Sequence, residues 1–126
     1  MAAKISIPAD CGNSPRKRFI KDIIVAIAEG DDAQLLKLIT NEPEWDLVGK
    51  STKTPMPFVK TLEKSALWNA KSTTINTIIT HGTDASVDGM LITLKGSLLA
   101  FCHVISFGGA GGFKIKSVRS FLIAIG

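Results

Sequence analysis

Two residues of the sequence have the chemistry of an acid–base pair, Asp88 and His103. They lie in consecutive stretches with the composition of β-strands. Between these stretches, Lys95-Gly96 predicts a two-residue hairpin turn, because glycine readily adopts positive φ. Counting cross-strand pairs outward from that turn places Asp88 directly opposite His103. An aspartate beside an imidazole fixes its tautomer and raises its basicity, which is what a general base needs. Asp88 and His103 are therefore the first candidate catalytic residues.

The same register sorts the surrounding side chains into two faces. Large apolar residues share the face of the pair, namely Met90, Ile92, Leu99, Phe101, Ile105 and Phe107. The opposite face of the later strand carries smaller residues, namely Ala100, Cys102, Val104 and Ser106. We expect the larger face to be the concave one that helices cover, where apolar walls shift pKa values from their solution positions.

The pair depends on this register. A slip of one residue, or a β-bulge at Gly89, would separate Asp88 from His103. Three interpretations therefore remain open: a catalytic pair, a structural hydrogen bond between two half-buried groups, and two separate exposed residues. Cys102 alternates away from His103, which disfavours a cysteine–histidine nucleophile pair.

A second candidate acid, Asp46, follows Trp45 on a short predicted strand, 45–48. The alternatives are a core or interface aromatic for Trp45 and a solvated strand residue for Asp46. The sequence has no His-x-His or Glu-x-x-His spacing, so it predicts no metal site, and we expect no cofactor.

Helical segments occupy most of the first half of the chain. Ser14 is a suitable N-cap, Pro15 suits the first helical position, and Gly30 is a typical stop for this first helix. A second helix begins at Asp31 or Asp32 and ends by Asn41 and Pro43, and a third is predicted over 58–68.

Four strands follow, over 73–81, 85–94, 98–107 and 113–125. Residues 1–13 read as an arm with little regular structure, and 14–126 as a single domain. The predicted fold class is α+β, with three N-terminal helices packed against a curved antiparallel sheet that forms a cone.

The composition of the chain bears on whether it binds nucleic acids or membranes. The chain of 126 residues has a net charge of +4, with basic residues scattered and not interleaved with aromatic ones, so we expect no nucleic-acid binding. No apolar run is long enough to span a bilayer, no leader is evident, and the two cysteines match no disulfide pattern. We expect a protein of the cytoplasm that does not bind membranes.

Several short motifs accompany this order of elements, namely Ala28-Glu29-Gly30-Asp31, Glu44-Trp45-Asp46-Leu47-Val48-Gly49, Ile78-Ile79-Thr80-His81-Gly82, Val87-Asp88-Gly89 and Phe101-Cys102-His103-Val104-Ile105-Ser106-Phe107. From Ser14 on, the chain resembles the nuclear transport factor 2-like (SnoaL-like) superfamily, whose members have a cystatin-like α+β cone. It is most similar to small bacterial members of unassigned function. It departs from many relatives at Thr54-Pro55-Met56-Pro57, where they place a glycine before the third helix.

This resemblance implies a fold and not one reaction, since the superfamily includes isomerases, dehydratases, epoxide hydrolases, polyketide cyclases and non-catalytic carriers or adaptors. The first functional hypothesis is a protein that binds a small apolar molecule in the cone, with or without proton-transfer chemistry. Its candidate pocket walls are Trp45, Leu62, Met90 and Phe101. The alternative is a non-catalytic interaction or carrier module. Under either hypothesis we expect a homodimer formed through the small-residue face of the sheet.

Overall fold

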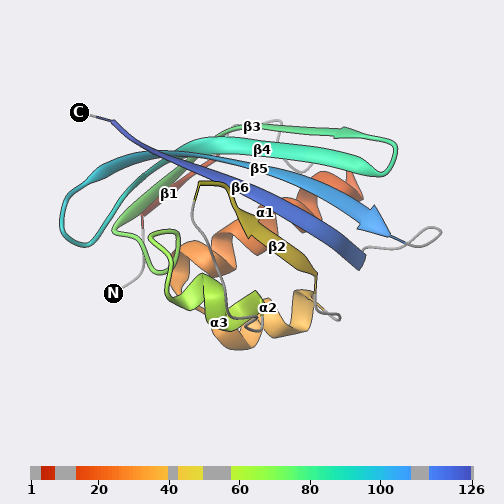
Figure 1. The fold of residues 1–126 in the computed structure, drawn as a ribbon, viewed down its shortest axis with the longest axis horizontal. Helices are drawn as coiled ribbons and strands as arrows, with labels where there is room; N and C mark the ends of the chain where they lie inside the picture. Colours follow the sequence, from red (N-terminus) through yellow and green to blue (C-terminus); the bar gives the residue numbers. More distant parts are fainter. Residues whose placement is uncertain (1–3, 8–13, 40–42, 50–57, 109–113, 126) are drawn as a thin grey trace.

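The structure is a computed structural model that describes residues 4–7, 14–39, 43–49, 58–108 and 114–125. It is an α+β fold, as the sequence predicts (Figure 1). In chain order its elements are β1 (Lys4–Ser6), α1 (Pro15–Glu29), α2 (Asp32–Leu38), β2 (Glu44–Leu47), α3 (Phe58–Glu63), β3 (Ser72–His81), β4 (Asp84–Ile92), β5 (Leu98–Gly108) and β6 (Lys114–Ala124).

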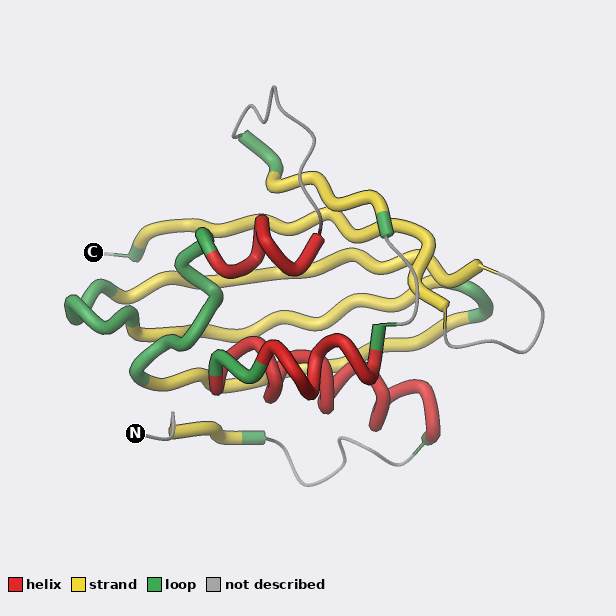
Figure 2. The backbone as a smooth tube through the Cα atoms, turned by 90° about the horizontal axis from the view of Figure 1, so that it is seen from below, coloured by secondary structure: helices red, strands yellow, loops and turns green. Residues whose placement is uncertain are grey.

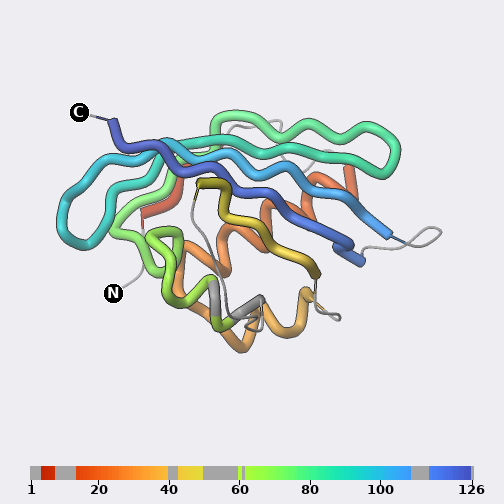
Figure 3. The backbone as a smooth tube through the Cα atoms, in the orientation of Figure 1, coloured from red at the N-terminus to blue at the C-terminus, as the bar shows by residue number. Residues whose placement is uncertain are grey.

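The sheet is mixed, where the sequence predicted an antiparallel one. It is six-stranded, in the order β1-β3-β4-β5-β6-β2. The four long strands form the predicted antiparallel meander, but β1 joins β3 and β2 joins β6 in parallel. Figure 3 shows β2 running beside β6 at one edge of this sheet.

The N-terminal arm contains a strand that the sequence analysis did not predict. Lys4, Ile5 and Ser6 pair with Ser72, Thr73 and Thr74 of β3. A strand this short has no periodicity of its own, and it depends on a partner far along the chain.

The first helix forms where its local signals predict it. The Ser14 side chain accepts a hydrogen bond from the backbone N–H of Lys17, and Gly30 ends the helix in the left-handed conformation (φ 66°). The apolar stripe of α1, including Ile20, Ile23, Ile24 and Ile27, is buried. This stripe packs into the main hydrophobic core.

The other two helices are shorter than predicted. Asp31 caps α2 by accepting from the N–H of Gln34, but the helix ends at Leu38. Asn41, the predicted stop, lies outside the described residues. Helix α3 ends at Glu63 and not at Trp68, and Ser65 bonds back to the carbonyl of Leu62 just after it.

The helices lie on one face of the sheet and leave the other face uncovered, as Figures 1 and 2 show. The covered face carries the core, to which β5 contributes Phe101, Ile105 and Phe107. Arg16 at the start of α1 lies over the ring of Phe107, 4.7 Å from its centroid, and donates to the carbonyl of Gly82 in the β3–β4 turn. These contacts fix one end of α1 against the sheet.

The hairpin between β4 and β5 differs from the prediction by one residue. The N–H of Thr93 donates to the carbonyl of Ser97, so the loop consists of Leu94, Lys95 and Gly96. Gly96 has φ 93°, and its N–H donates to the carbonyl of Thr93, which is the geometry of a type I turn followed by a left-handed residue. Because Gly96 takes the third loop position, the register shifts by one relative to a two-residue turn.

Candidate functional site

The predicted Asp88–His103 pair does not form, because the register places these residues on opposite faces of the sheet. His103 is opposite Val87, and Asp88 is opposite Cys102. Side chains alternate along a strand, so a shift of one residue moves Asp88 from the covered face to the uncovered one. The expectation that His103 and Phe101 face the helices is confirmed, since both are buried on that side.

His103 is held inside the cone by a chain of hydrogen bonds. The indole Nε1–H of Trp45 on β2 donates to the hydroxyl Oγ of Ser120 on β6, at 2.7 Å. The same Oγ lies 2.6 Å from Nδ1 of His103. Ser120 is 0% exposed and His103 4% exposed. Side chains from three strands, β2, β6 and β5, are therefore joined by hydrogen bonds within an apolar core.

The donor rules favour one tautomer of His103. Indole N–H can only donate, so Ser120 accepts from Trp45 and has its own proton to give. Giving that proton to Nδ1 makes the bond between Ser120 and His103 and places the ring proton on Nε2. Nε2–H is then the polar group through which His103 can meet another molecule.

Burial keeps this imidazole uncharged. Removal from water lowers the pKa of His103 from 6.5 to about 4. At neutral pH the ring is therefore a neutral hydrogen-bonding group and not a cation. A neutral imidazole in an apolar setting can orient a ligand by one hydrogen bond without the cost of burying a charge.

The free space beside His103 is small. One cavity of about 20 Å³ is lined by α1, by Trp45, Leu62 and His103, and by residues of β5 and β6. A second, of about 10 Å³, lies between His103 and Thr73. Thr73 is 4% exposed. Among the buried side-chain nitrogen and oxygen atoms of the described residues, its Oγ1 is the one without a hydrogen-bond partner. The cone interior has polar groups but little room.

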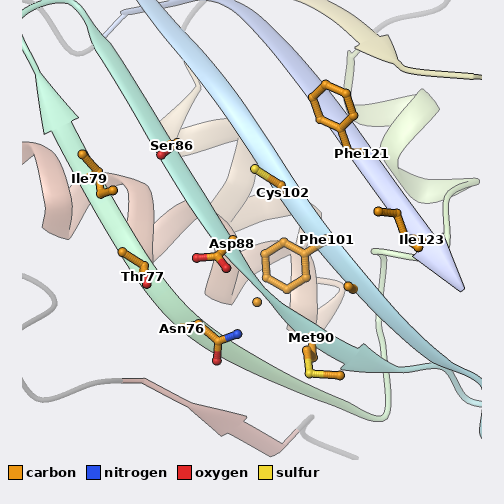
Figure 4. Close-up of a pocket in the computed structure, with 12 residues that line it drawn as sticks. Asn76, Thr77, Ile79, Ser86, Asp88, Met90, Phe101, Cys102, Phe121 and Ile123 are labelled. Carbon is orange, nitrogen blue, oxygen red and sulfur yellow. The ribbon is translucent and has the colours of Figure 1, made fainter. Parts of the chain in front are cut away.

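A much larger hollow lies on the uncovered face of the sheet, shown in Figure 4. Its volume is about 570 Å³, and its walls come from β3, β4, β5 and β6. Asp88 lines it near Thr77, and Met90 and Ile123 also line it. Burial and, to a lesser degree, the charge of Asp88 raise the pKa of the Cys102 thiol in this hollow.

Phe101 packs against the glycine of the neighbouring strand. Its side chain lies over Gly89 on β4, where a Cβ would lie 2.8 Å from Cζ of the ring and 1.9 Å from the carbonyl oxygen of Thr74. Phe101 is among the residues that line the outer hollow and the smaller inner cavity. Its ring fills the place on the covered face where β4 has no side chain.

The structure divides the predicted site residues into two groups. Trp45, Leu62 and His103 line the inner cavity, whereas Asp88 and Met90 line the outer hollow. Asp46 is exposed and shares its register level with Arg119 of β6, so it lies outside the cone.

Sequence reasoning missed Ser120 and Thr73. Ser120 belongs to the inward-facing residues of β6, after Ile115 and Val118. Their alternation along β6 is interrupted, because the register of the β5–β6 pair shifts between Ser106 and Phe107. A single serine in an apolar series is the only sequence signal of this hydrogen-bond centre. Thr73 lies in a strand that begins with several polar residues, so nothing in the sequence distinguishes it.

Comparison with known proteins supplies the fold. No family model matches the sequence, and no characterised protein matches it by sequence. Among solved structures, a ketosteroid isomerase-like protein from Kribbella flavida superposes with a TM-score of 0.67 at 10% identity, covering 85% of this chain and 76% of that one.

Two further solved structures are similar. An epoxide hydrolase/cyclase-like enzyme of pyran-ring formation in the polyether salinomycin has a TM-score of 0.66 at 15% identity, over 88% of this chain and 92% of that one. A nuclear transport factor 2-like protein of unknown function from Cytophaga hutchinsonii has a TM-score of 0.63 at 13% identity, over 85% and 88%. Identities this low establish a common fold alone. Together with the helices on one face of a curved sheet, they show that the chain has the nuclear transport factor 2-like (SnoaL-like) fold.

Proposed function

We propose that the cone binds a small, largely apolar molecule with one hydrogen-bond acceptor, and that His103 is its polar contact. The observation that carries the proposal is the bond chain from Trp45 through Ser120 to His103, which holds a neutral imidazole against apolar walls. Burying polar groups costs free energy unless they are satisfied, and here hydrogen bonds hold the imidazole at a fixed place on the cavity wall. The similar folds include isomerase-like and cyclase-like proteins, which supports a ligand site in the cone.

The size of the cavity restricts the ligand. A space of about 20 Å³ has room for about one water molecule, so a larger ligand must displace a wall side chain. Leu62 is the wall residue from α3, a helix of six residues, whereas the other walls belong to α1 and the sheet. Displacement of Leu62 is therefore the least costly way to enlarge the site.

Binding is favoured over catalysis. Proton transfer needs a donor and an acceptor of matched pKa, and the described residues that line the two inner cavities include one titratable side chain, His103. Asp88 and Asp46 lie outside the cone. We therefore propose a binding protein. Isomerase-type chemistry would require the ligand or a residue outside the described ranges to supply the second group.

A pair of probes of nearly equal shape tests the hydrogen bond. Cyclohexanone carries an acceptor oxygen, and methylenecyclohexane replaces that oxygen by carbon. In Leu62→Ala, which enlarges the cavity, we expect cyclohexanone to raise the melting temperature and shift the NMR signals of the His103 ring, and methylenecyclohexane to bind more weakly. Leu36→Ala is the matched control, because Leu36 is 57% exposed and makes no wall of the cavity.

The result of this experiment distinguishes a ligand-binding site from a core that only has a structural role. Equal binding of both probes would contradict a polar role for His103. Absence of any stabilisation in both the unmodified chain and Leu62→Ala would contradict a ligand site in the cone.

A further inference from the structure

The polar side chains that line the outer hollow lie on neighbouring strands. On β3 and β4 they include Asn76, Thr77 and Asp88, whereas the lining side chains of β6 are the apolar Phe121 and Ile123. The volume of the hollow, about 570 Å³, is in the range of sites for small molecules. The hollow therefore combines a polar group on β3 and β4 with apolar walls, which is the arrangement that an amphiphilic ligand needs.

An irregularity in the pairing of β3 with β4 brings these polar side chains together. Ile75 pairs with Gly89 and Thr77 pairs with Asp88, so Asn76 is the extra residue of a β-bulge on β3. In a regular strand, one of two consecutive residues faces inward. The bulge instead leaves both Asn76 and Thr77 exposed on the outer face, where they line the hollow together with Asp88 (Figure 4).

Asp88 supplies the negative charge of this group. It is half-buried, and within the described ranges it forms no ion pair. Arg119 on β6 is exposed and level with Ser86, which places it one outward position along the strands and two strands away from Asp88. A carboxylate that is partly removed from water gains from a donor of positive charge held close to it. A cationic ligand is therefore favoured beside Asp88.

An ammonium group fits these side chains better than a metal ion does. The amide oxygen of Asn76, the hydroxyl of Thr77 and the carboxylate of Asp88 are all acceptors, and a primary ammonium has three N–H donors and no acceptor. A calcium ion takes six or more oxygen ligands and usually several carboxylates. In the part of the chain that the structure describes, no group of three or more His, Cys, Asp and Glu side chains is placed to hold a metal.

We propose that the outer hollow binds a primary amine with a long apolar body, and that Asp88 holds its ammonium group. The register gives the path of the body. Asp88 is level with Cys102 on β5, and Cys102 is level with Phe121 on β6. Neighbouring strands are about 5 Å apart, so the body crosses the small side chain of Cys102 and reaches Phe121 about 10 Å from β4. Octylamine has this form and is the probe of choice.

NMR titration with two probes of equal chain length tests the charge. Octylamine is protonated at neutral pH, and octan-1-ol replaces the ammonium group by a neutral hydroxyl. We expect octylamine to shift the backbone signals of Thr77, Ala100 and Cys102, and Asp88→Asn to weaken its binding by about tenfold, because a hydrogen bond to a charged group is lost. Octan-1-ol should bind Asp88→Asn and the unmodified chain equally, which also shows that the variant keeps the fold of the hollow.

Two further variants separate the site from a general attraction of cations. Asp84→Asn is the matched control, because Asp84 is an exposed carboxylate of the same strand that does not line the hollow. It should bind octylamine as the unmodified chain does. Ile123→Ser removes an exposed apolar wall and should weaken both probes to the same degree. Equal weakening by Asp84→Asn and Asp88→Asn, or equal affinity of the unmodified chain for the two probes, would overturn the proposal.

This inference does not depend on a ligand in the cone, because His103 and the outer hollow are on opposite faces of the sheet. The signals of the His103 ring should stay unchanged when octylamine binds, so failure at one site leaves the other untouched. Sedimentation velocity on the same samples identifies a different occupant. If the chain is dimeric and octylamine shifts no signal of the hollow, a second copy covers this face and the proposal is wrong.

Discussion

At the scale of single residues, His103 makes stability depend on pH. Its pKa is about 4 in the folded chain and near 6.5 when unfolded, so between these values the unfolded chain binds more protons. The free energy of unfolding therefore rises with pH through this range. The contribution is complete above pH 6.5 and is lost as the pH falls toward 4.

Replacement of His103 by Asn should remove this dependence. Between pH 6.5 and pH 4, both the unmodified chain and His103→Asn should lose free energy of unfolding. We expect the loss in the unmodified chain to be larger by about 3 kcal/mol. Urea denaturation at several pH values measures both. His81→Gln is the matched control, since His81 is exposed and the variant should keep the full slope. Parallel curves for His103→Asn and the unmodified chain would show that His103 is solvated.

The sequence predicted the face of β5 on which candidate residues lie, but not which residues they contact on the neighbouring strands. The alternation of β5 correctly puts His103 and Phe101 on the helix side, because alternation is a property of one strand. The partner of His103 was wrong, because it depends on how many residues the next turn holds. Ser120 became visible only when β6 was placed beside β5.

At the scale of elements, Gly89 allows β3 and β4 to pair across an irregularity. The register shifts between Ile75 and Thr77, and at this point the carbonyl oxygen of Thr74 approaches Gly89. A Cβ at Gly89 would lie 1.9 Å from that oxygen, so a larger residue requires the backbone to move. Glycine is needed here for close approach and not for an unusual φ.

Gly89→Ala should consequently destabilise the protein far more than an ordinary strand substitution. We expect a loss of about 3 kcal/mol or more, because backbone cannot yield as a side chain does. The thermal or urea midpoint measures the loss. Ser86→Ala, a half-buried position on the outer face of the same strand, should change stability by less than about 1 kcal/mol. Similar midpoints for the two variants would contradict the close approach.

The elements that were predicted well are those with local signals. The limits of α1 follow from Ser14, Pro15 and Gly30, all within one or two residues of its ends. The turn before β5 was misjudged because Lys95-Gly96 fits a two-residue loop as well as the end of a longer one. Pairing with β3 is what makes Lys4–Ser6 a strand, so no local pattern reveals it.

At the scale of the whole molecule, short parallel strands close both edges of an antiparallel meander. β1 covers the start of β3, and β2 covers β6 and brings Trp45 to Ser120. Edge strands that are left open are sites of unwanted pairing, so these additions protect the sheet as well as extend it. Parallel pairing demands a long connection, which here includes the helices that cover the sheet.

Removal of residues 1–7 should test the contribution of β1. The deletion removes the pairing with β3 and the packing of Ile7 against the core, and we expect it to lower the free energy of unfolding by about 1–3 kcal/mol while the fold persists. Urea denaturation followed by circular dichroism measures this. Lys4→Ala, which keeps the backbone and alters an exposed side chain, should be nearly neutral. An unchanged midpoint after deletion would mean that β1 adds nothing to stability.

The position of Phe101 has a consequence for how two strands share one side chain. Because Gly89 has no side chain, the ring of Phe101 on β5 fills the place beside it on the covered face, within 2.8 Å of where a Cβ would lie. The packing of β4 at this level therefore depends on a residue of the neighbouring strand, so motion of that ring would open a gap over the backbone of Gly89.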